Sequence, residues 1–193
     1  NMRRYGGLAK FMPITSITFG LGYLAIIGVP PFAGFYSKDK IIETAFNAGG
    51  LQGVLFGSAA LLGAVITAFY MTRLMLMTFF GNKRWAQGSE PHESPFLMWA
   101  PMAVLAVGSV ASGYLLYSGK AIVKWLAPVV DKNQHEHTEF LPPIVVTTLA
   151  VVAVIIGVSI AFIKYRGELS ESAPSEVSIF TRVTRRDLLQ DDA

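Results

Sequence analysis

The chain has 193 residues, of which 52% are hydrophobic and only 15% are charged, and its net charge is +3. Soluble domains carry about 25% charged residues, so this composition, with a mean hydropathy of +0.47, excludes an ordinary soluble domain. The chain has no cysteine, which excludes a disulfide framework and thiolate metal sites.

Four apolar stretches are long enough to cross a bilayer, whose core of about 30 Å needs about 20 apolar helical residues. They cover residues 13–48, 54–80, 96–117 and 141–163. Backbone N–H and C=O groups in lipid must form hydrogen bonds within the protein, and a helix does this within one segment. Each stretch is therefore predicted to be helical, including the β-branched run VVTTLAVVAVIIGV. The predicted fold class is an all-α integral membrane protein, a bundle of four transmembrane spans in which the first is a discontinuous (broken) helix.

The connecting segments are polar. Residues 118–140 contain an amphipathic patch, AIVKWLAPVV, followed by DKNQHEHTE. Residues 164–193 include VSIFTRVTRRDLL, whose apolar and basic side chains fall on different helical faces, as in a helix that lies on a membrane or along a partner. The chain starts at Asn1, and its last residues, RRDLLQDDA, do not complete a secondary-structure element. We therefore expect it to be one piece of a longer chain.

The loop charges predict an orientation. With four crossings, residues 1–12, 81–95 and 164–193 lie on one side and carry ten Lys and Arg, whereas residues 118–140 carry three. The positive-inside rule then places the first side in the cytoplasm. We expect both ends of the chain on the cytoplasmic side. The membrane would be the plasma membrane of a bacterium (its inner membrane) or the mitochondrial equivalent.

The first apolar stretch contains its own interruption, IIGVPPFAGFYSKDK. Pro30 and Pro31 lack N–H groups and clash with the preceding turn, and Gly34 adds conformational freedom. Helices over 13–29 and 37–48 would be about 25 and 18 Å long, which together exceed the bilayer core. The break is therefore predicted to lie inside the membrane.

A break at that depth leaves carbonyl groups near residues 26–29 without helical partners, which is tolerated only inside protein or beside a wet cavity. Ser37 is predicted to cap the second half-helix, with Asp39 favourable in its first turn.

The two lysines after the break differ in their helical neighbours. Lys40 faces Glu43 at i+3 and can pair with it. Lys38 faces Ile41 and Ile42 near a helix N-terminus, where burial and the helix dipole both disfavour its charged form. Such a lysine can exchange a proton near neutral pH, which makes it a candidate site within a membrane. The alternative is that these charges lie at the far interface and reach the headgroups.

The other ionisable residues are weaker candidates. Arg73 lies eight residues before Gly81 and can reach the interface or pair with a neighbouring loop. His92, His135 and His137 fall in loops, and the HEH motif offers no third metal ligand. The sequence shows no nucleotide-binding loop, nucleophile triad or nucleic-acid patch, so no metal or cofactor site is predicted.

The stretch IIGVPPFAGFYSKDKI resembles the broken helix of the antiporter-like membrane subunits of respiratory complex I, which share a fold with subunits of multi-component Na⁺/H⁺ antiporters. Its Ser-Lys-Asp run resembles the L type (mitochondrial subunit 5 type) rather than the M or N types. RRYGGLAKFMP, TAFYMTRLMLMTFFG and PHESP resemble the loop before that helix, the next helix and the loop after it. The resemblance covers about residues 1–120, and the remainder fits by hydropathy alone.

The resemblance implies a proton-transfer role for Lys38, with Asp39 beside it, in a chain of buried ionisable groups. Lys40 departs from the glutamate or small polar residue that is more usual there. The other ionisable groups of the family would precede Asn1, and its long transverse helix would follow the fourth span.

The implied function is proton translocation within NADH–quinone oxidoreductase, without redox chemistry in this chain. NADH, FMN, iron–sulfur clusters and quinone would then bind other subunits, and the partners would be the lipid bilayer and a neighbouring antiporter-like subunit. A subunit of a multi-component Na⁺/H⁺ antiporter is the alternative, and a membrane scaffold without an ion path is a third hypothesis. H⁺ and Na⁺ are both candidate ions, because Lys38 would carry a proton whereas carboxylates elsewhere could hold Na⁺.

Overall fold

The computed structural model describes residues 2–86, 88–129 and 141–167, and this part of the chain is helical, without strands. Its helices are η1 (Met2–Arg4), η2 (Leu8–Lys10), α1 (Pro13–Ile27), α2 (Ala33–Phe46), α3 (Gly50–Thr78), α4 (Phe96–Tyr117), η3 (Ser118–Lys120), α5 (Ala121–Leu126) and α6 (Pro143–Tyr165). Within these described ranges, three helices are long and apolar enough to cross a membrane, namely α3, α4 with its continuation through α5, and α6, and α1 is a shorter apolar helix. The predicted all-α class is confirmed.

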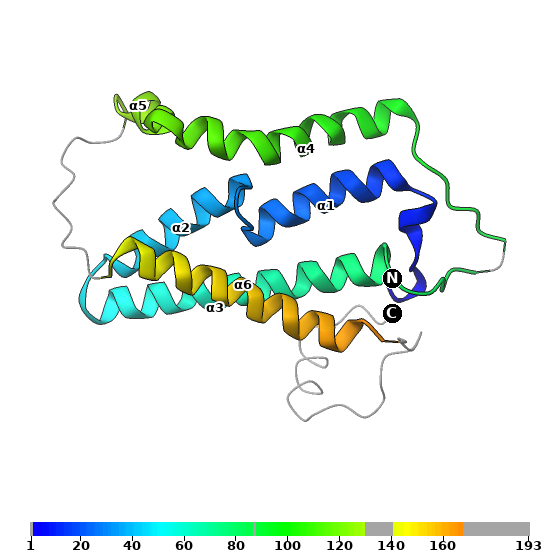
Figure 1. Ribbon diagram of the computed structural model, residues 1–193, viewed down its shortest axis with the longest axis horizontal. Coiled ribbons are helices and arrows are strands. Elements are labelled where there is room, and N and C mark those ends of the chain that lie inside the picture. The colour runs from blue at the N-terminus through cyan, green and yellow to red at the C-terminus, as the bar shows by residue number, and fades with distance from the viewer. Residues whose placement is uncertain (1, 87, 130–140, 168–193) are drawn as a thin grey trace, which may run out of the picture.

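The helices run roughly parallel to one long axis (Figure 1). α1 and α2 follow each other along this axis, and α3 returns beside them in the opposite direction. α6 makes the most extensive contact with α3, whereas α4 packs against α1 and α2. The pairing of α3 with α6 is close because Gly157 has no Cβ, which would collide with the carbonyl of Val65.

Two small cores hold this arrangement, one on each side of the gap between α1 and α2. Both bury aliphatic side chains of α3 or α6 against the end of α1 or the inner face of α2, and their buried members are Ile27, Ala68, Met71 and Val154 in the first and Ile42, Phe46, Val146 and Ala150 in the second. Large apolar side chains on the outer face of α4 stay exposed. Such a surface is typical of a helix that faces lipid or further helices.

The N-terminal segment and the loop after α3 lie together at one end of the bundle (Figure 1). The backbone N–H of Gly7 donates to the carbonyl of Phe80 over 3.1 Å. The side chain of Arg84 donates to the carbonyls of Arg3 and Met77 over 2.9 and 2.7 Å. These bonds join two segments that the charge pattern had placed on the same side of the membrane.

Candidate functional site

The region 13–48 consists of two helices in the structure. α1 ends at Ile27, and Gly28 adopts a left-handed conformation (φ 84°) whose N–H bonds back to carbonyls of the last turn. Such a conformation favours glycine because it has no Cβ. Pro30 and Pro31 follow, and the N–H of Phe32 donates to the carbonyl of Val29 over 2.9 Å. α2 then begins immediately at Ala33.

Two residues that were predicted to belong to the break lie within α2 instead. Ser37 does not cap the helix, because the N-cap is Phe32 and the exposed Ser37 hydroxyl donates to the carbonyl of Gly34 over 3.3 Å. The prediction was wrong because the turn after the prolines leads directly into helical hydrogen bonds. Gly34 has a packing role, since a Cβ there would collide with the carbonyl of Ala25.

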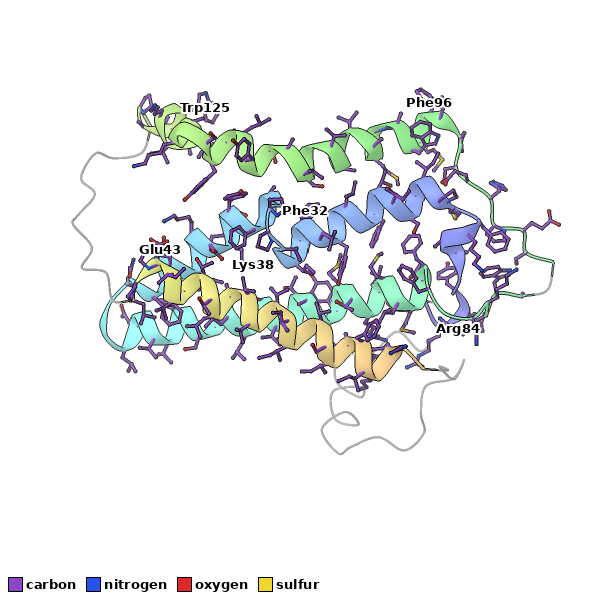
Figure 2. The ribbon with its side chains drawn as sticks, in the orientation of Figure 1. Phe32, Lys38, Glu43, Arg84, Phe96 and Trp125 are labelled. Carbon is purple, nitrogen blue, oxygen red and sulfur yellow. The ribbon has the colours of Figure 1, made fainter. Side chains whose placement is uncertain are left out.

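Lys38 supplies partners for the free carbonyls at the end of α1. Its Nζ donates to the carbonyl oxygens of Ile26 and Ile27 over 3.1 and 3.2 Å. The side chain is half-buried and passes over Gly28 beside the gap between the two helices (Figure 2). The last four carbonyls of a helix lack helical partners and carry partial negative charge. The ammonium group is therefore stabilised where α1 ends.

The prediction that the N-terminal dipole of the second half-helix acts on Lys38 was wrong. The sequence had placed the lysine at the start of the second half-helix, where a cation is disfavoured. Because α2 begins at Ala33, Lys38 lies beyond its first turn and faces the C-terminus of α1 instead. A helix C-terminus favours a cation.

Asp39 faces a different helix from its neighbour Lys38. Its Oδ2 accepts a hydrogen bond of 2.7 Å from the hydroxyl of Thr147 on α6. In the described part of the chain, no ion pair joins Asp39 to Lys38, and the ion pair present there is Lys40 with Glu43. Sequence reasoning missed Thr147 because a threonine in an apolar run carries no signal until the facing helix is known.

Lys40 pairs locally, as the i+3 spacing predicts. Its Nζ lies 2.7 Å from Oε2 of Glu43, and its side chain is 57% exposed. An exposed pair of this kind has a small effect on stability. The structure thus separates the two lysines, one on a helix end and one in a surface ion pair.

Among the described residues, Arg73 contacts the end of α6. Its guanidinium carbon lies 5.3 Å from the centre of the Tyr165 ring, at the last residue of α6. The arrangement is typical of a cation–π contact. The Nε atom of Arg73 is buried and has no hydrogen-bond partner among the described residues.

Glu93 forms a cap on α1 that sequence reasoning missed. Its carboxylate accepts hydrogen bonds from the N–H groups of Ile14 and Thr15 over 2.8 and 3.4 Å and from the Thr15 hydroxyl over 2.5 Å. A helix N-terminus has free N–H groups and favours an anion. Partial burial opposes ionisation of Glu93, but the hydrogen bonds from Thr15, Ile14 and Ser94 outweigh it and lower its pKa. The only sequence signal was the PHESP motif.

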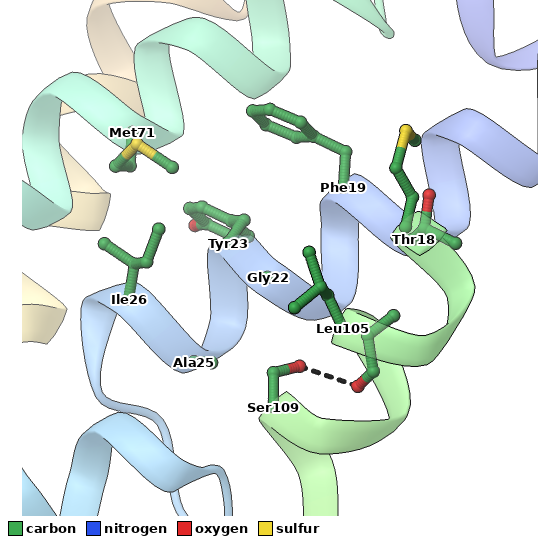
Figure 3. A pocket seen from close by; sticks show the side chains of 11 residues that line it. Thr18, Phe19, Gly22, Tyr23, Ala25, Ile26, Met71, Leu105 and Ser109 are labelled. Atoms are coloured by element: carbon green, nitrogen blue, oxygen red, sulfur yellow. Dashed lines mark hydrogen bonds between the residues drawn. The ribbon is translucent and has the colours of Figure 1, made fainter. Parts of the chain in front are cut away.

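A cavity of about 400 Å³ lies between α1 and α4 (Figure 3). Its lining is mostly apolar and includes Ile26, whose carbonyl binds Lys38. The three hydroxyls that line it have partners: Thr18 with the carbonyl of Ile14 over 3.0 Å, Tyr23 with Thr72 over 2.9 Å, and Ser109 with the carbonyl of Ala106 over 2.8 Å. Its lining extends along α1 as far as Ile26, one residue before the end of that helix.

Among the described residues, no three His, Cys, Asp or Glu side chains lie close enough together to hold a metal ion. His92 is exposed, and its ring nitrogen lies 3.2 Å from the carbonyl oxygen of Glu93. The HEH motif (His135 and His137) and the amphipathic segment within 168–193 fall outside the described residues.

Known proteins match most of this chain. A family model described as NADH:quinone oxidoreductase/Mrp antiporter, TM matches residues 1–67. NADH-quinone oxidoreductase subunit L of Mycobacterium tuberculosis (strain CDC 1551 / Oshkosh) is 56% identical over 99% of this chain and 30% of that protein. Subunit L of Rickettsia bellii (strain RML369-C) is 31% identical over 93% of this chain and 29% of that protein. Chain 5 of the NAD(P)H-quinone oxidoreductase of Picosynechococcus sp. is 42% identical over 60% of this chain and 20% of that protein.

The chain thus spans less than a third of the length of the curated relatives it matches. The matched region 1–67 contains α1, the gap and α2, which position Lys38 and Asp39. With 56% identity over nearly its whole length, the chain belongs to the family of NADH-quinone oxidoreductase subunit L.

Proposed function

We propose that this chain is part of a proton-translocating membrane subunit of NADH-quinone oxidoreductase, and that Lys38 carries the proton. The observation that carries the proposal is the Nζ of Lys38 bound to two carbonyls at the C-terminus of α1. An ionisable group inside a membrane is costly and commonly functional. Family membership supports the same role for the subunit.

The depth of Lys38 follows from helix lengths. α1 has 15 residues and α2 has 14, so each is about 20 Å long, and neither alone spans a core of about 30 Å. They lie in line beside α3, which has 29 residues (Figure 1). We therefore assign α1 and α2 to one interrupted span, so that the bundle crosses the membrane four times with Lys38 near the middle.

The bonding of Lys38 suits a group that changes its charge. An ammonium group has three N–H donors, and a neutral amine still has two. The carbonyls of Ile26 and Ile27 can accept from either form, so loss of the proton breaks no ion pair with either of them. A lysine in a strong ion pair would hold its proton more firmly.

The rest of the proposed function extends beyond this chain. We assign residues 2–12, 79–86, 88–95 and 164–167, at one end of the bundle, to the cytoplasmic side, and residues 47–49 and 118–129 to the opposite side. The redox cofactors would lie in other subunits, and a neighbouring antiporter-like subunit would continue the proton path. A bacterial inner membrane is the proposed location.

A subunit of a multi-component cation/proton antiporter is the second candidate. The matching family model covers both kinds of protein, and the same Lys38 geometry would serve either. The two differ in their energy source. NADH oxidation drives proton uptake in the first, whereas a Na⁺ gradient drives it in the second without NADH.

The test uses substitutions in the full-length subunit within the intact complex, in inverted membrane vesicles. Lys38→Ala removes the titrating group, and Lys38→Arg keeps the charge in a group that hardly releases its proton. Both are expected to remove most of the proton uptake per NADH oxidised. Asp39→Asn should have an intermediate effect, and Lys40→Gln, which breaks a surface ion pair, is the matched control.

Native gels establish that each variant complex assembles. Full proton uptake by an assembled Lys38→Arg complex would refute the assignment of the carrier. Na⁺-driven uptake that needs no NADH would select the antiporter candidate instead.

A further inference from the structure

The carboxylate of Asp39 is bound to α6 although its sequence neighbour is the proposed carrier. Thr147 donates its hydroxyl proton to Oδ2 of Asp39 over 2.7 Å, across 108 positions of sequence. Both side chains are half-buried. A hydrogen bond to an ionised group is stronger than one between neutral groups, so this contact holds the carboxylate in place.

Packing sets the rotation of α6 that makes this contact. Val146 and Ile42 are each 1% exposed and belong to the same core cluster between α6 and α2. With Val146 buried, the next residue, Thr147, faces Asp39. Thr148 is exposed, and its hydroxyl donates to the carbonyl of Ile144 in its own helix over 2.7 Å. Two adjacent threonines therefore have different roles.

We propose that Thr147 is a positioning residue for the Lys38 site: its hydroxyl holds the Asp39 carboxylate toward α6 and away from the Lys38 ammonium. This inference rests on the proposed function of Lys38 as the proton carrier. The bond keeps the carrier bound to neutral carbonyls rather than paired with a carboxylate.

Among the described residues, few other charged groups can influence Asp39. α1 and α4 contain no Asp, Glu, Lys or Arg. α3 contains Arg73 and α6 contains Lys164. Both residues lie toward the helix ends that are remote from Asp39, and Arg73 contacts Tyr165 there. The remaining charged groups of the described residues at this end are Lys38, Lys40 and Glu43 on α2, and Lys120 and Lys124 in η3 and α5; the phenols of Tyr36 on α2 and Tyr117 on α4 also lie here.

Loss of the Thr147 hydroxyl would leave the half-buried Asp39 carboxylate without its hydrogen bond. A partly buried carboxylate without a partner is unfavourable. Lys38 and Lys40 flank Asp39 in the sequence, and Lys40 is already paired with Glu43, so Lys38 is the flanking lysine without a carboxylate partner among the described residues. An ion pair there would favour the protonated lysine and slow the release of its proton.

The experiment replaces Thr147 in the full-length subunit of the intact complex and records the pH profile of NADH-driven proton uptake. Thr147→Val keeps the shape and removes the hydroxyl. It is expected to move the profile toward higher pH by about one unit, so that uptake near neutral pH falls by about tenfold. Thr147→Ser should restore the profile of the unmodified protein, and Thr148→Val is the matched control.

A double substitution separates positioning from packing. In an Asp39→Asn background there is no carboxylate to release, so Thr147→Val should cause no further shift. If the shift persists there, Thr147 does not act through Asp39 and the inference is refuted. An unshifted Thr147→Val profile, in a complex where Lys38→Arg still stops uptake, also refutes it but leaves the proposed function intact.

Native gels again establish assembly. If Thr147→Val does not assemble, Thr147→Ala provides the same comparison with and without Asp39→Asn. Retained uptake in Lys38→Arg would instead refute the proposed function, and this inference with it.

Discussion

The two ends of α1 are held by side chains of opposite charge. At the N-terminus, the Glu93 carboxylate accepts hydrogen bonds from backbone N–H groups, and at the C-terminus the Lys38 ammonium donates to backbone carbonyls. Each charge complements the partial charge of its helix end. The ends differ in depth, because Glu93 belongs to a loop at one end of the bundle and Lys38 lies beside the middle of the bundle (Figures 1 and 2).

This difference in depth distinguishes Glu93, which caps a helix, from Lys38, which is the candidate proton carrier. Glu93 is ionised at physiological pH, because the ordinary pKa of a glutamate already lies well below that pH and the hydrogen bonds of Glu93 lower its pKa further. Lys38 contacts neutral carbonyls that can accept from both of its protonation states. The same physical device therefore serves stability at one end and, in the proposed function, proton transfer at the other.

The largest expected effect comes from adding a methyl group where α2 packs closely against the C-terminal end of α1. Gly34→Ala would drive a Cβ into the carbonyl of Ala25 and force α2 away from α1. We expect a loss of stability of about 3 kcal/mol, seen as a lower unfolding temperature in detergent or failed assembly. Gly63→Ala is the matched control, because a Cβ there meets nothing within 4 Å. It should stabilise α3 by about 1 kcal/mol, and equal effects at both sites would contradict this account of Gly34.

Removing the N-terminal cap should lower stability but leave function unchanged. Glu93→Ala exposes the N–H groups of Ile14 and Thr15, with an expected cost of about 1 kcal/mol. Thermal unfolding in detergent measures the change, and Glu90→Ala, at an exposed position of the same loop, is the control. Proton uptake per NADH should stay the same. A loss of uptake without a loss of stability would show that the two ends do not differ as described.

The pH dependence of this cap has a definite sign. The pKa of Glu93 is lowered from its usual value of 4.5 in the folded protein. Its contribution to stability is therefore fully present above 4.5 and is lost as the pH falls through the lower folded value. Glu93→Gln cannot titrate, so the difference in unfolding temperature between it and the unmodified protein should shrink in acid. A difference that grows with acidification would contradict the assigned hydrogen bonds.

The smallest effect is expected at the surface pair beside the carrier. Lys40→Gln removes an exposed ion pair with Glu43, and its cost should be at most about 0.5 kcal/mol. A double-mutant cycle with Glu43→Gln measures the coupling. A coupling of several kcal/mol would mean that Lys40, and not only Lys38, is part of the site.

The sequence by itself determined the features that depend on neighbouring residues. Long apolar runs predict helices, and the predicted 96–117 agrees with α4, because a membrane helix satisfies its own backbone hydrogen bonds. The pair Lys40–Glu43 followed from helical spacing. Local rules failed at Ser37, where capping preference pointed to a serine, because the turn at Val29 and Phe32 had already started α2.

Only the tertiary structure decided which groups meet across helices. Glu93 caps a helix that begins about 80 positions earlier, and Thr147 reaches Asp39 across 108. Lys38 meets Ile26 and Ile27 because the turn at Gly28 and the close approach at Gly34 bring α2 back onto the end of α1. Hydropathy records whether a residue is apolar, but the rotation of one helix against another is set by packing, and that rotation selects which polar side chains become partners.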